Sequence, residues 1–430
     1  MTFSAALLAL TGGALPFIVS VAYRGAAEAR WAMLLIVGGF WLRMFACALV
    51  SQLSFFSHAG GGDCGAYLIF GDYVVKSWRS EGLYFATVDT HPELAEVLGS
   101  ATLFVNFIAF IGYIDGEMNR FGAVSIIAFA TALTAINMHK TAIAFGAPPR
   151  RALLAVGLFY LSPGLLFHTS DTYKDGFVLF FTTNALLGVF RVSRRFSLAW
   201  LLAVAASLTG LWYTRFYFVY MTIAPLSVSL LGLRSKSMLR ILSGVVVLSV
   251  AAILGLAYLG KNLASFQERA AQTYESATSV EVRDWNEKGG SGVDFDDGGD
   301  PFAKLPQKIA YTLLSPFPWT GGSFGLQVGK FDALLIYYLL YRSFFSAKRL
   351  LRDDPPLLFM FLVFIVPSVV AYAMTMANIG LILRQRLPII AILTVLACVG
   401  WETDLAGARE KKRKLPPQHA ILERLRTPAE

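Results

Sequence analysis

Apolar stretches long enough to cross a lipid bilayer recur along most of this 430-residue chain, and they limit its possible folds more than any other feature. A transmembrane helix needs about 20 mainly apolar residues. Only 15% of the residues are charged, whereas soluble domains carry about 25%. We therefore predict an all-α, polytopic transmembrane helix bundle with about eleven spans, at residues 2–22, 31–54, 121–138, 152–168, 175–190, 197–213, 217–233, 239–259, 331–346, 356–376 and 387–402.

The basic residues between these spans orient the chain. The net charge is +9, and membrane proteins carry an excess of Lys and Arg on the cytoplasmic side. If the basic clusters lie inside, the spans alternate correctly from residue 139 to the end. Topology then explains the positive charge, and nucleic acid is not a predicted partner. The N-terminus faces out, the C-terminus faces in, and the segments predicted to face out are 169–174, 214–216, 260–308 and 377–386.

Residues 99–115 break this alternation, because a crossing there would move a basic loop or the first polar loop to the other side. We expect a juxtamembrane or re-entrant helix, since surrounding protein can bury such backbone. A true span with an inverted N-terminal pair is the alternative. The predicted organisation is a transmembrane domain and a basic cytoplasmic tail, with two large outer loops in the former; these parts are 1–402, 403–430, 55–120 and 260–308.

The larger outer loop and the tail have two interpretations each. The acidic, glycine-rich part of 260–308 is typical of a solvated loop, with Ca²⁺ binding as the alternative, and its first half has helical character that suits a lid. The tail is either solvated or in contact with lipid headgroups. The three cysteines, Cys47, Cys64 and Cys398, have no CxxC spacing, so neither a disulfide framework nor a cysteine metal site is predicted.

Five polar clusters lie at the outer ends of predicted spans. Charged groups at such positions are unfavourable unless they line a wet site, so they are functional candidates. Together, their carboxylates and arginines suggest a site for an anionic, lipid-linked substrate. The clusters are residues 58–67, 168–175, Arg215, 315–319 and 384–386.

The two N-terminal clusters contain the acidic candidates. Asp63 follows three glycines, and its carboxylate is either a general base for a sugar hydroxyl or a helix cap. Lys174 and Asp175 open a predicted span. Asp175 either caps that helix, where the dipole favours an anion, or positions an acceptor hydroxyl or a metal. Tyr67 and His91 in the first loop are further candidates for substrate contacts.

The remaining clusters contribute arginines and an aromatic ring. Arg215 lies among aromatic residues and either binds a phosphate or extends toward the interface. Trp319, in a proline-rich turn, either stacks on a sugar ring or anchors the chain at the interface. Arg384 and Arg386 lie outside the last predicted span, against the positive-inside bias. Guanidinium groups match phosphate geometry, so these two are predicted to bind phosphate.

Three short motifs together resemble those of bacterial integral-membrane sugar transferases of the GT-C superfamily, and also those of exopolysaccharide and O-antigen polymerases. The first is an Asp-x3-Tyr element at Asp63 and Tyr67. The second combines Pro163, Ser170 and Lys174-Asp175, and the third is the RxRLP element that begins at Arg384. His91-Pro92 with the following apolar segment is similar to the superfamily's first outer loop, although Glu93 replaces its second proline.

The resemblance implies a GT-C-like membrane glycosyltransferase that works in cell-surface polysaccharide synthesis. Asp63 corresponds to the catalytic base, and Arg384 or Arg386 corresponds to the contact with the lipid phosphate. The expected partners are a polyprenyl-(pyro)phosphate-linked sugar or oligosaccharide, a glycan acceptor and membrane lipids. No cofactor is assigned, and a divalent cation, Mg²⁺ or Mn²⁺, is left open. The implied location is the bacterial inner membrane, with the site facing the periplasm.

Two other functions stay open. A repeat-unit polymerase would use the same chemistry, with an oligosaccharide as donor and acceptor. A transporter or flippase for a lipid-linked glycan would be expected to contain broken helices near the bilayer midplane. The gathering of charge at one face of the chain favours the transferase.

Overall fold

The computed structural model describes residues 2–52, 63–194, 197–215, 218–219, 221–223, 292–293, 295, 302–321, 324–374 and 378–399. Apart from one isolated bridge between Gly292 and Asn378, the regular elements of these residues are all helical. The predicted all-α class is therefore confirmed. In the N-terminal half the helices are α1 (Phe3–Ala22), α2 (Ala29–Gln52), α4 (Asp63–Glu81), η1 (Pro92–Leu94), α5 (Ala95–Asp115), α6 (Arg120–Ala144), α7 (Pro149–Tyr160), α8 (Pro163–Thr169), α9 (Asp175–Arg194) and α10 (Leu198–Arg215).

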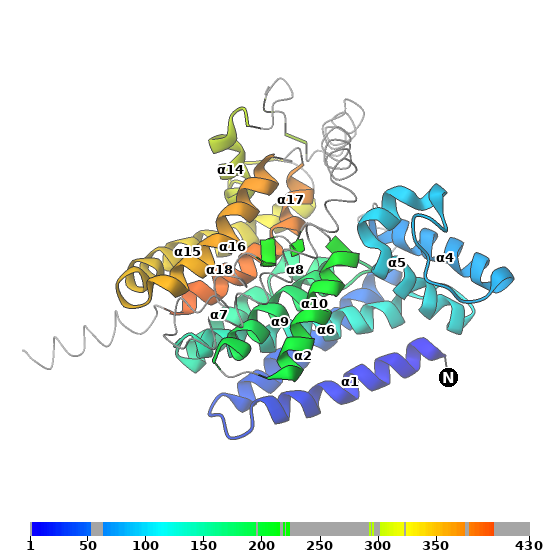
Figure 1. Ribbon diagram of the computed structural model, residues 1–430, viewed down its shortest axis with the longest axis horizontal. Helices are drawn as coiled ribbons and strands as arrows, with labels where there is room; N and C mark the ends of the chain where they lie inside the picture. The colour runs from blue at the N-terminus through cyan, green and yellow to red at the C-terminus, as the bar shows by residue number, and fades with distance from the viewer. Residues whose placement is uncertain are drawn as a thin grey trace, which may run out of the picture.

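The C-terminal half adds a second group of helices. In Figure 1, α4 and α5 lie at one side of the molecule, the C-terminal helices lie at the other, and α6, α9 and α10 run between them. The C-terminal helices are α14 (Leu305–Leu314), α15 (Phe324–Asp353), α16 (Pro355–Met374), α17 (Ile379–Gln385) and α18 (Leu387–Val399).

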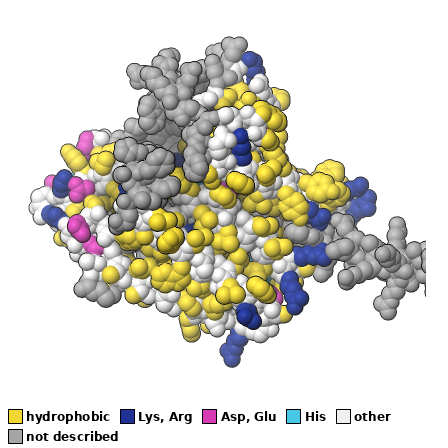
Figure 2. Space-filling view, turned by 180° about the vertical axis from the view of Figure 1, so that it is seen from behind, with side chains coloured by type: hydrophobic (Ala, Val, Ile, Leu, Met, Phe, Trp, Pro, Cys, Tyr) yellow, Lys and Arg dark blue, Asp and Glu magenta, His cyan; other side chains and the backbone are white. Residues whose placement is uncertain are grey.

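Five of these helices are long and apolar enough to cross a membrane, and seven spans result if each of two bent helix pairs counts as one. The chain is thus a membrane protein, as predicted, and its apolar side chains cover much of the face in Figure 2. The number of eleven spans stays a prediction. Most of 217–233 and all of 239–259 lie outside the described residues, and α10 and α15 are not among the five.

The two bent pairs differ from the predicted unbroken spans. We predicted one span over 152–168, but α7 and α8 meet there at 61°. Pro163 explains the break, because proline has no N–H to continue the helical ladder. The pair α17 and α18 meets at 51°, with Arg386 at the junction and Pro388 directly after it. The prediction began the last span at residue 387 and missed α17.

Helix α6 forms the centre of the bundle. In its most apolar 18-residue stretch, 72% of the residues are buried. It contacts α1, α2, α7, α9 and α18. Small residues such as Gly122, Ala128 and Ala132 let neighbouring helices approach closely, as is common between membrane helices. The pair α9 and α10 packs beside it. This core holds the first turns of α9 and the end of α10 in fixed positions.

Helix α5 includes residues 99–115, the segment that does not fit the predicted alternation of the chain between the two sides of the membrane. It is kinked at Ala101, and its apolar part, Ala101–Asp115, is shorter than a normal span. It contacts α4, α10 and α1. These features fit the expected juxtamembrane helix, although the side on which it lies stays a prediction.

Candidate functional site

The connection between α8 and α9 is buried and polar. Ser170, Asp171, Thr172, Lys174 and Asp175 are each no more than 6% exposed. Helix α8 begins at Pro163 and is only seven residues long, and a new helix begins at Asp175, so the connection between them is a short turn. Buried polar side chains need partners, so the contacts of this connection define the candidate site.

Asp175 lies between two arginines that come from other helices. Its Oδ1 is 3.1 Å from Nη2 of Arg215, at the end of α10, and its Oδ2 is 3.4 Å from Nε of Arg384 in α17. The exposed fractions of the three side chains are 2%, 3% and 11%. Three of the residues predicted for the site are thus brought together. Removing one partner from such a buried pair typically costs about 3–5 kcal/mol.

Aromatic rings flank the cations of this cluster. Nζ of Lys174 lies 5.8 Å from the ring centre of Tyr67 in α4, and the guanidinium of Arg384 lies 5.5 Å from that of Tyr173. The negative face of a ring attracts a cation at such distances. Tyr67 and Lys174, which were predicted separately, are therefore also neighbours in the structure.

Asp63 is the first described residue of α4. Its side chain lies outside the described part of the structure. The next residue, Cys64, accepts a hydrogen bond through its carbonyl oxygen from Oγ1 of Thr172, at 2.9 Å. The first turn of α4 therefore lies against the connection that carries Lys174 and Asp175.

A second carboxylate, Asp171, occupies the same connection. Its Oδ2 is 3.4 Å from Nη1 of Arg120, at the start of α6, and its Oδ1 accepts a hydrogen bond from the backbone N–H of Thr172. Asp171 lies within the predicted cluster 168–175 but was not singled out as a site residue, and Arg120 was not predicted. A signal was present for both, since each is a charged residue at the end of an apolar stretch.

Arg386 does not join this cluster. It is 1% exposed, and its Nη1 donates to the backbone oxygens of Thr312 and Leu313, at 3.2 and 3.3 Å. These carbonyls belong to the last turn of α14, where helix oxygens lack intrahelical partners. Arg384 and Arg386 were predicted as a joint phosphate clamp, but their guanidinium groups engage different partners.

Two further predicted site residues, His91 and Trp319, contact residues outside the cluster around Asp175. Nε2 of His91 lies 2.7 Å from the hydroxyl of Tyr84, and its Nδ1 lies 2.8 Å from Glu93, so both ring nitrogens are engaged. Trp319 is 80% exposed and stacks on Phe317 at 5.1 Å between ring centres. Neither has a described contact with the Asp175 cluster.

Arg43, in the middle of α2, is a buried cation that we did not predict as a functional residue. It is fully buried, and its Nε donates to Oγ1 of Thr169 at 2.7 Å. Its Nη2 donates to the carbonyl of Tyr160, the last residue of α7, at 2.6 Å. Arg43 thus joins the two halves of the bent pair that leads into the candidate site.

The described residues contain no group of three or more His, Cys, Asp or Glu side chains that could hold a metal ion. Asp171 and Asp175, the two carboxylates in the cluster, each face an arginine.

Comparison of the chain with protein-family models, curated proteins and solved structures finds no match. The chemical properties of the cluster therefore carry the functional argument. It combines Lys174, Arg215, Arg384 and Arg120 with two carboxylates and adjoins the first turn of α4. Guanidinium and ammonium groups bind phosphate through charge and hydrogen bonds.

Proposed function

We propose that this chain is a membrane glycosyltransferase with a polyprenyl-(pyro)phosphate-linked sugar donor. The observation that supports this most is the pair of arginines, Arg215 and Arg384, that converge on Asp175 beside Lys174. Charged groups buried within a helical membrane protein mark substrate sites by default. A donor of this class brings a phosphate, which such cations recognise, and a lipid chain, which the surrounding bilayer accommodates.

The reaction would transfer a sugar to a hydroxyl group of the glycan acceptor. The acceptor oxygen bonds to the anomeric carbon, the bond between that carbon and the phosphate oxygen breaks, and the lipid phosphate leaves with its electron pair. The acceptor proton passes to the carboxylate of Asp63. Arg384, Arg215 and Lys174 stabilise the charge that develops on the leaving phosphate, which is commonly the largest catalytic contribution.

Asp175 would act by positioning rather than by touching the substrate. Its two carboxylate oxygens face different guanidinium groups, so it holds both arginines in place before the donor binds. Groups that are oriented in advance need no reorganisation during the reaction. The proposed site faces the periplasm of a bacterial inner membrane, in line with the predicted topology.

The test uses the full chain in lipid nanodiscs, with polyprenyl-phosphate-linked sugars as donors and lipid-linked glycans as acceptors. We expect Arg384→Gln to lower kcat/KM about 100-fold or more, as loss of a charge-stabilising group typically does. Arg352→Gln, an exposed arginine in the last turn of α15, is the matched control and should retain activity. Normal transfer by Arg384→Gln would refute the proposal.

The role of Asp63 has its own test. Asp63→Asn should abolish transfer while the protein still inserts in the membrane, because an amide cannot take the acceptor proton. Product formed at the normal rate by this variant would exclude Asp63 as the base. In a deletion strain, loss of one sugar from every repeat would favour a monosaccharide transferase, whereas single capped repeats would favour the polymerase.

A transporter for a lipid-linked glycan is a second candidate, and the bent pairs support it. Both α7–α8 and α17–α18 are interrupted within one would-be span, and discontinuous helices often form the substrate sites of transporters. Arg384 lies at the end of the broken helix α17. Proteoliposomes separate the two functions, because a transporter moves a labelled lipid-linked sugar to the other leaflet without forming a new glycosidic bond.

A further inference from the structure

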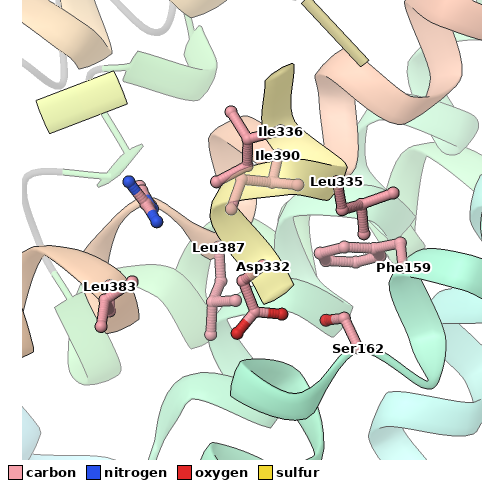
Figure 3. Close-up of a pocket in the computed structure, with 9 residues that line it drawn as sticks. Phe159, Ser162, Asp332, Leu335, Ile336, Leu383, Leu387 and Ile390 are labelled. Atoms are coloured by element: carbon pink, nitrogen blue, oxygen red, sulfur yellow. The ribbon is translucent and has the colours of Figure 1, made fainter. Parts of the chain in front are cut away.

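The breaks of both bent pairs meet at one small buried cavity. The α7–α8 break contributes Ser162, the α17–α18 break contributes Arg386, and Asp332 comes from α15 between them. Apolar side chains such as Phe159 and Leu387 close the rest of the cavity (Figure 3). The cavity has room for about one water molecule. It is therefore too small for a sugar or a phosphate.

Asp332 connects the cavity to the start of α8. Its Oδ2 accepts a hydrogen bond from the backbone N–H of Gly164 at 2.7 Å. Its Oδ1 has no partner within normal hydrogen-bond geometry among the described residues, and the nearby Ser162 hydroxyl interacts favourably with the carboxylate. In Figure 3 the oxygens of Asp332 and Ser162 face each other. The Asp332 side chain leaves no space for a Cβ at Gly164, so the contact is close. One carboxylate oxygen fixes the broken helix, and the other faces the cavity.

Arg386 lines the same cavity. Its Nη1 is engaged by the carbonyls of α14, whereas its Nε and Nη2 have no hydrogen-bond partner within the described part of the chain. Asp332 and Arg386 form no direct ion pair within 4 Å, although their charges interact. Two opposite charges that are both more than nine-tenths buried need further compensation. A water molecule in the cavity can supply it by accepting from the guanidinium and donating to the carboxylate.

We propose that Asp332 and Arg386 form a water-bridged charge pair that fixes the two broken spans relative to each other and so positions Arg384 against Asp175. Arg384 lies in α17, two residues before Arg386 at the junction with α18, and α8 leads directly into the connection that ends at Asp175. Asp332 and Arg386 thus lie next to α8 and α17, the two helices that lead to Asp175 and carry Arg384. Arg386 is a positioning residue in this arrangement, and the part of the inference that concerns turnover rests on the proposed function.

The positioning role is tested first without reference to activity. Phe167 in α8 and Leu381 in α17 are 42% and 38% exposed, so cysteines there can carry spin labels in a chain whose three native cysteines are buried. Double electron–electron resonance in lipid nanodiscs then measures the distance between the two spin labels, and so between α8 and α17. We expect one narrow distance distribution, which shifts or broadens in Asp332→Asn and in Arg386→Gln but not in the control Arg352→Gln.

An unchanged distribution in both single variants would overturn the inference. Where a single variant fails to fold, the double variant Asp332→Asn/Arg386→Gln decides. Each single variant leaves one buried charge without its opposite charge, whereas the double variant leaves none. The double variant should therefore insert, and it should unfold at a higher temperature than either single variant. Additive destabilisation in the double variant would contradict a coupled pair.

Turnover separates positioning from phosphate binding. Asp332→Asn and Arg386→Gln should both lower kcat while KM for the lipid-linked donor stays within about twofold, because the interaction lost is with the protein. If Arg386→Gln raised KM as a lost phosphate contact would, and Asp332→Asn did not lower kcat, Arg386 would be a phosphate ligand and the inference would be wrong. Absence of turnover in the unaltered protein would refute the proposed function alone, and the distance measurement would still decide the inference.

Discussion

Buried arginines in this chain share a role at the ends of broken or short helices. Arg43 donates to the last carbonyl of α7, and Arg386 donates to two carbonyls in the last turn of α14. The final carbonyls of a helix lack intrahelical partners. Within a membrane, water does not compensate them, so protein groups must. These arginines supply the hydrogen bonds that the last carbonyl groups of these helices would otherwise lack.

Arg43→Leu should therefore destabilise the protein strongly. The change removes three hydrogen bonds, to Thr169, Gly39 and Tyr160, and each buried group left without a partner costs on the order of 1–3 kcal/mol. Thermal unfolding in detergent would measure the loss. Arg30→Leu, at an exposed position near the start of the same helix, is the control. Equal Tm values for the two variants would contradict this account.

The Cys64 thiol should be unreactive in the folded protein. Cys64 is buried at the start of α4, within the segment 55–120 that we predict as the first outer loop. Burial, and secondarily the charge of Asp171, raises the pKa of this thiol to about 11. The neutral thiol thus contributes stability below its ordinary pKa near 9, and this contribution is lost as the pH rises from about 9 to 11.

A water-soluble maleimide in a Cys47→Ala/Cys398→Ala background would check this prediction, because thiolate is the reactive form. We expect little labelling of the folded protein at pH 7.5 and complete labelling after denaturation. Ser80→Cys, at an exposed position of the same helix, should react rapidly. Equal labelling rates at residues 64 and 80 would show that Cys64 is accessible.

At the scale of helices, close packing depends on a few glycines. A Cβ at Gly210 in α10 would overlap the ring of Phe181 in α9, whereas a Cβ at Gly38 in α2 would meet nothing. Alanine normally favours a helix over glycine by about 0.5–1 kcal/mol. Gly38→Ala should therefore raise the Tm slightly. Gly210→Ala should lower it, since overpacking typically costs about 1–3 kcal/mol. A higher Tm for both variants would contradict the tight α9–α10 contact.

The periodic, apolar helices were predictable from sequence, and their interruptions were less so. Spans predicted at 121–138, 175–190 and 356–376 correspond to α6, α9 and α16. Hydropathy averages over a window, so it cannot separate α7 from α8, although Pro163 marked the break. The short helix α17 was missed because residues 377–386 had been read as an outer segment.

Most residues of the candidate site could be predicted from the sequence, but the contacts between them could not. Tyr67, Lys174, Asp175, Arg215 and Arg384 were all named from sequence, and described contacts join Tyr67 to Lys174 and both arginines to Asp175. Arg384 and Arg386 were predicted to bind phosphate together because both lie outside the last predicted span, against the positive-inside bias, and they are two residues apart. On a helix, residues at that spacing do not face each other, which explains their separate partners. The positions of Asp332 and Arg120 depended on tertiary contacts between distant helices.

The arrangement of the whole molecule constrains its topology in the membrane. The backbone N–H of Ser4 donates to Oδ1 of Asp115 at 3.1 Å. The start of α1, the end of α5 and Gly116 therefore lie at the same end of the bundle. The pairing of Arg120 with Asp171 puts the start of α6 and the candidate site at that end as well. Any experiment that locates one of these positions locates the others.

We predict that reporters fused at the N-terminus and at Gly116 both give an extracytoplasmic signal, while a reporter after α18 gives a cytoplasmic one. The first two must agree, because the contact between Ser4 and Asp115 cannot form across a bilayer whose hydrocarbon core is about 30 Å thick. A cytoplasmic signal at both the N-terminus and Gly116 would mean that this end of the bundle, and the candidate site with it, faces inward. A lipid-linked donor would then have to be used at the cytoplasmic face, and the orientation proposed for the reaction would be wrong.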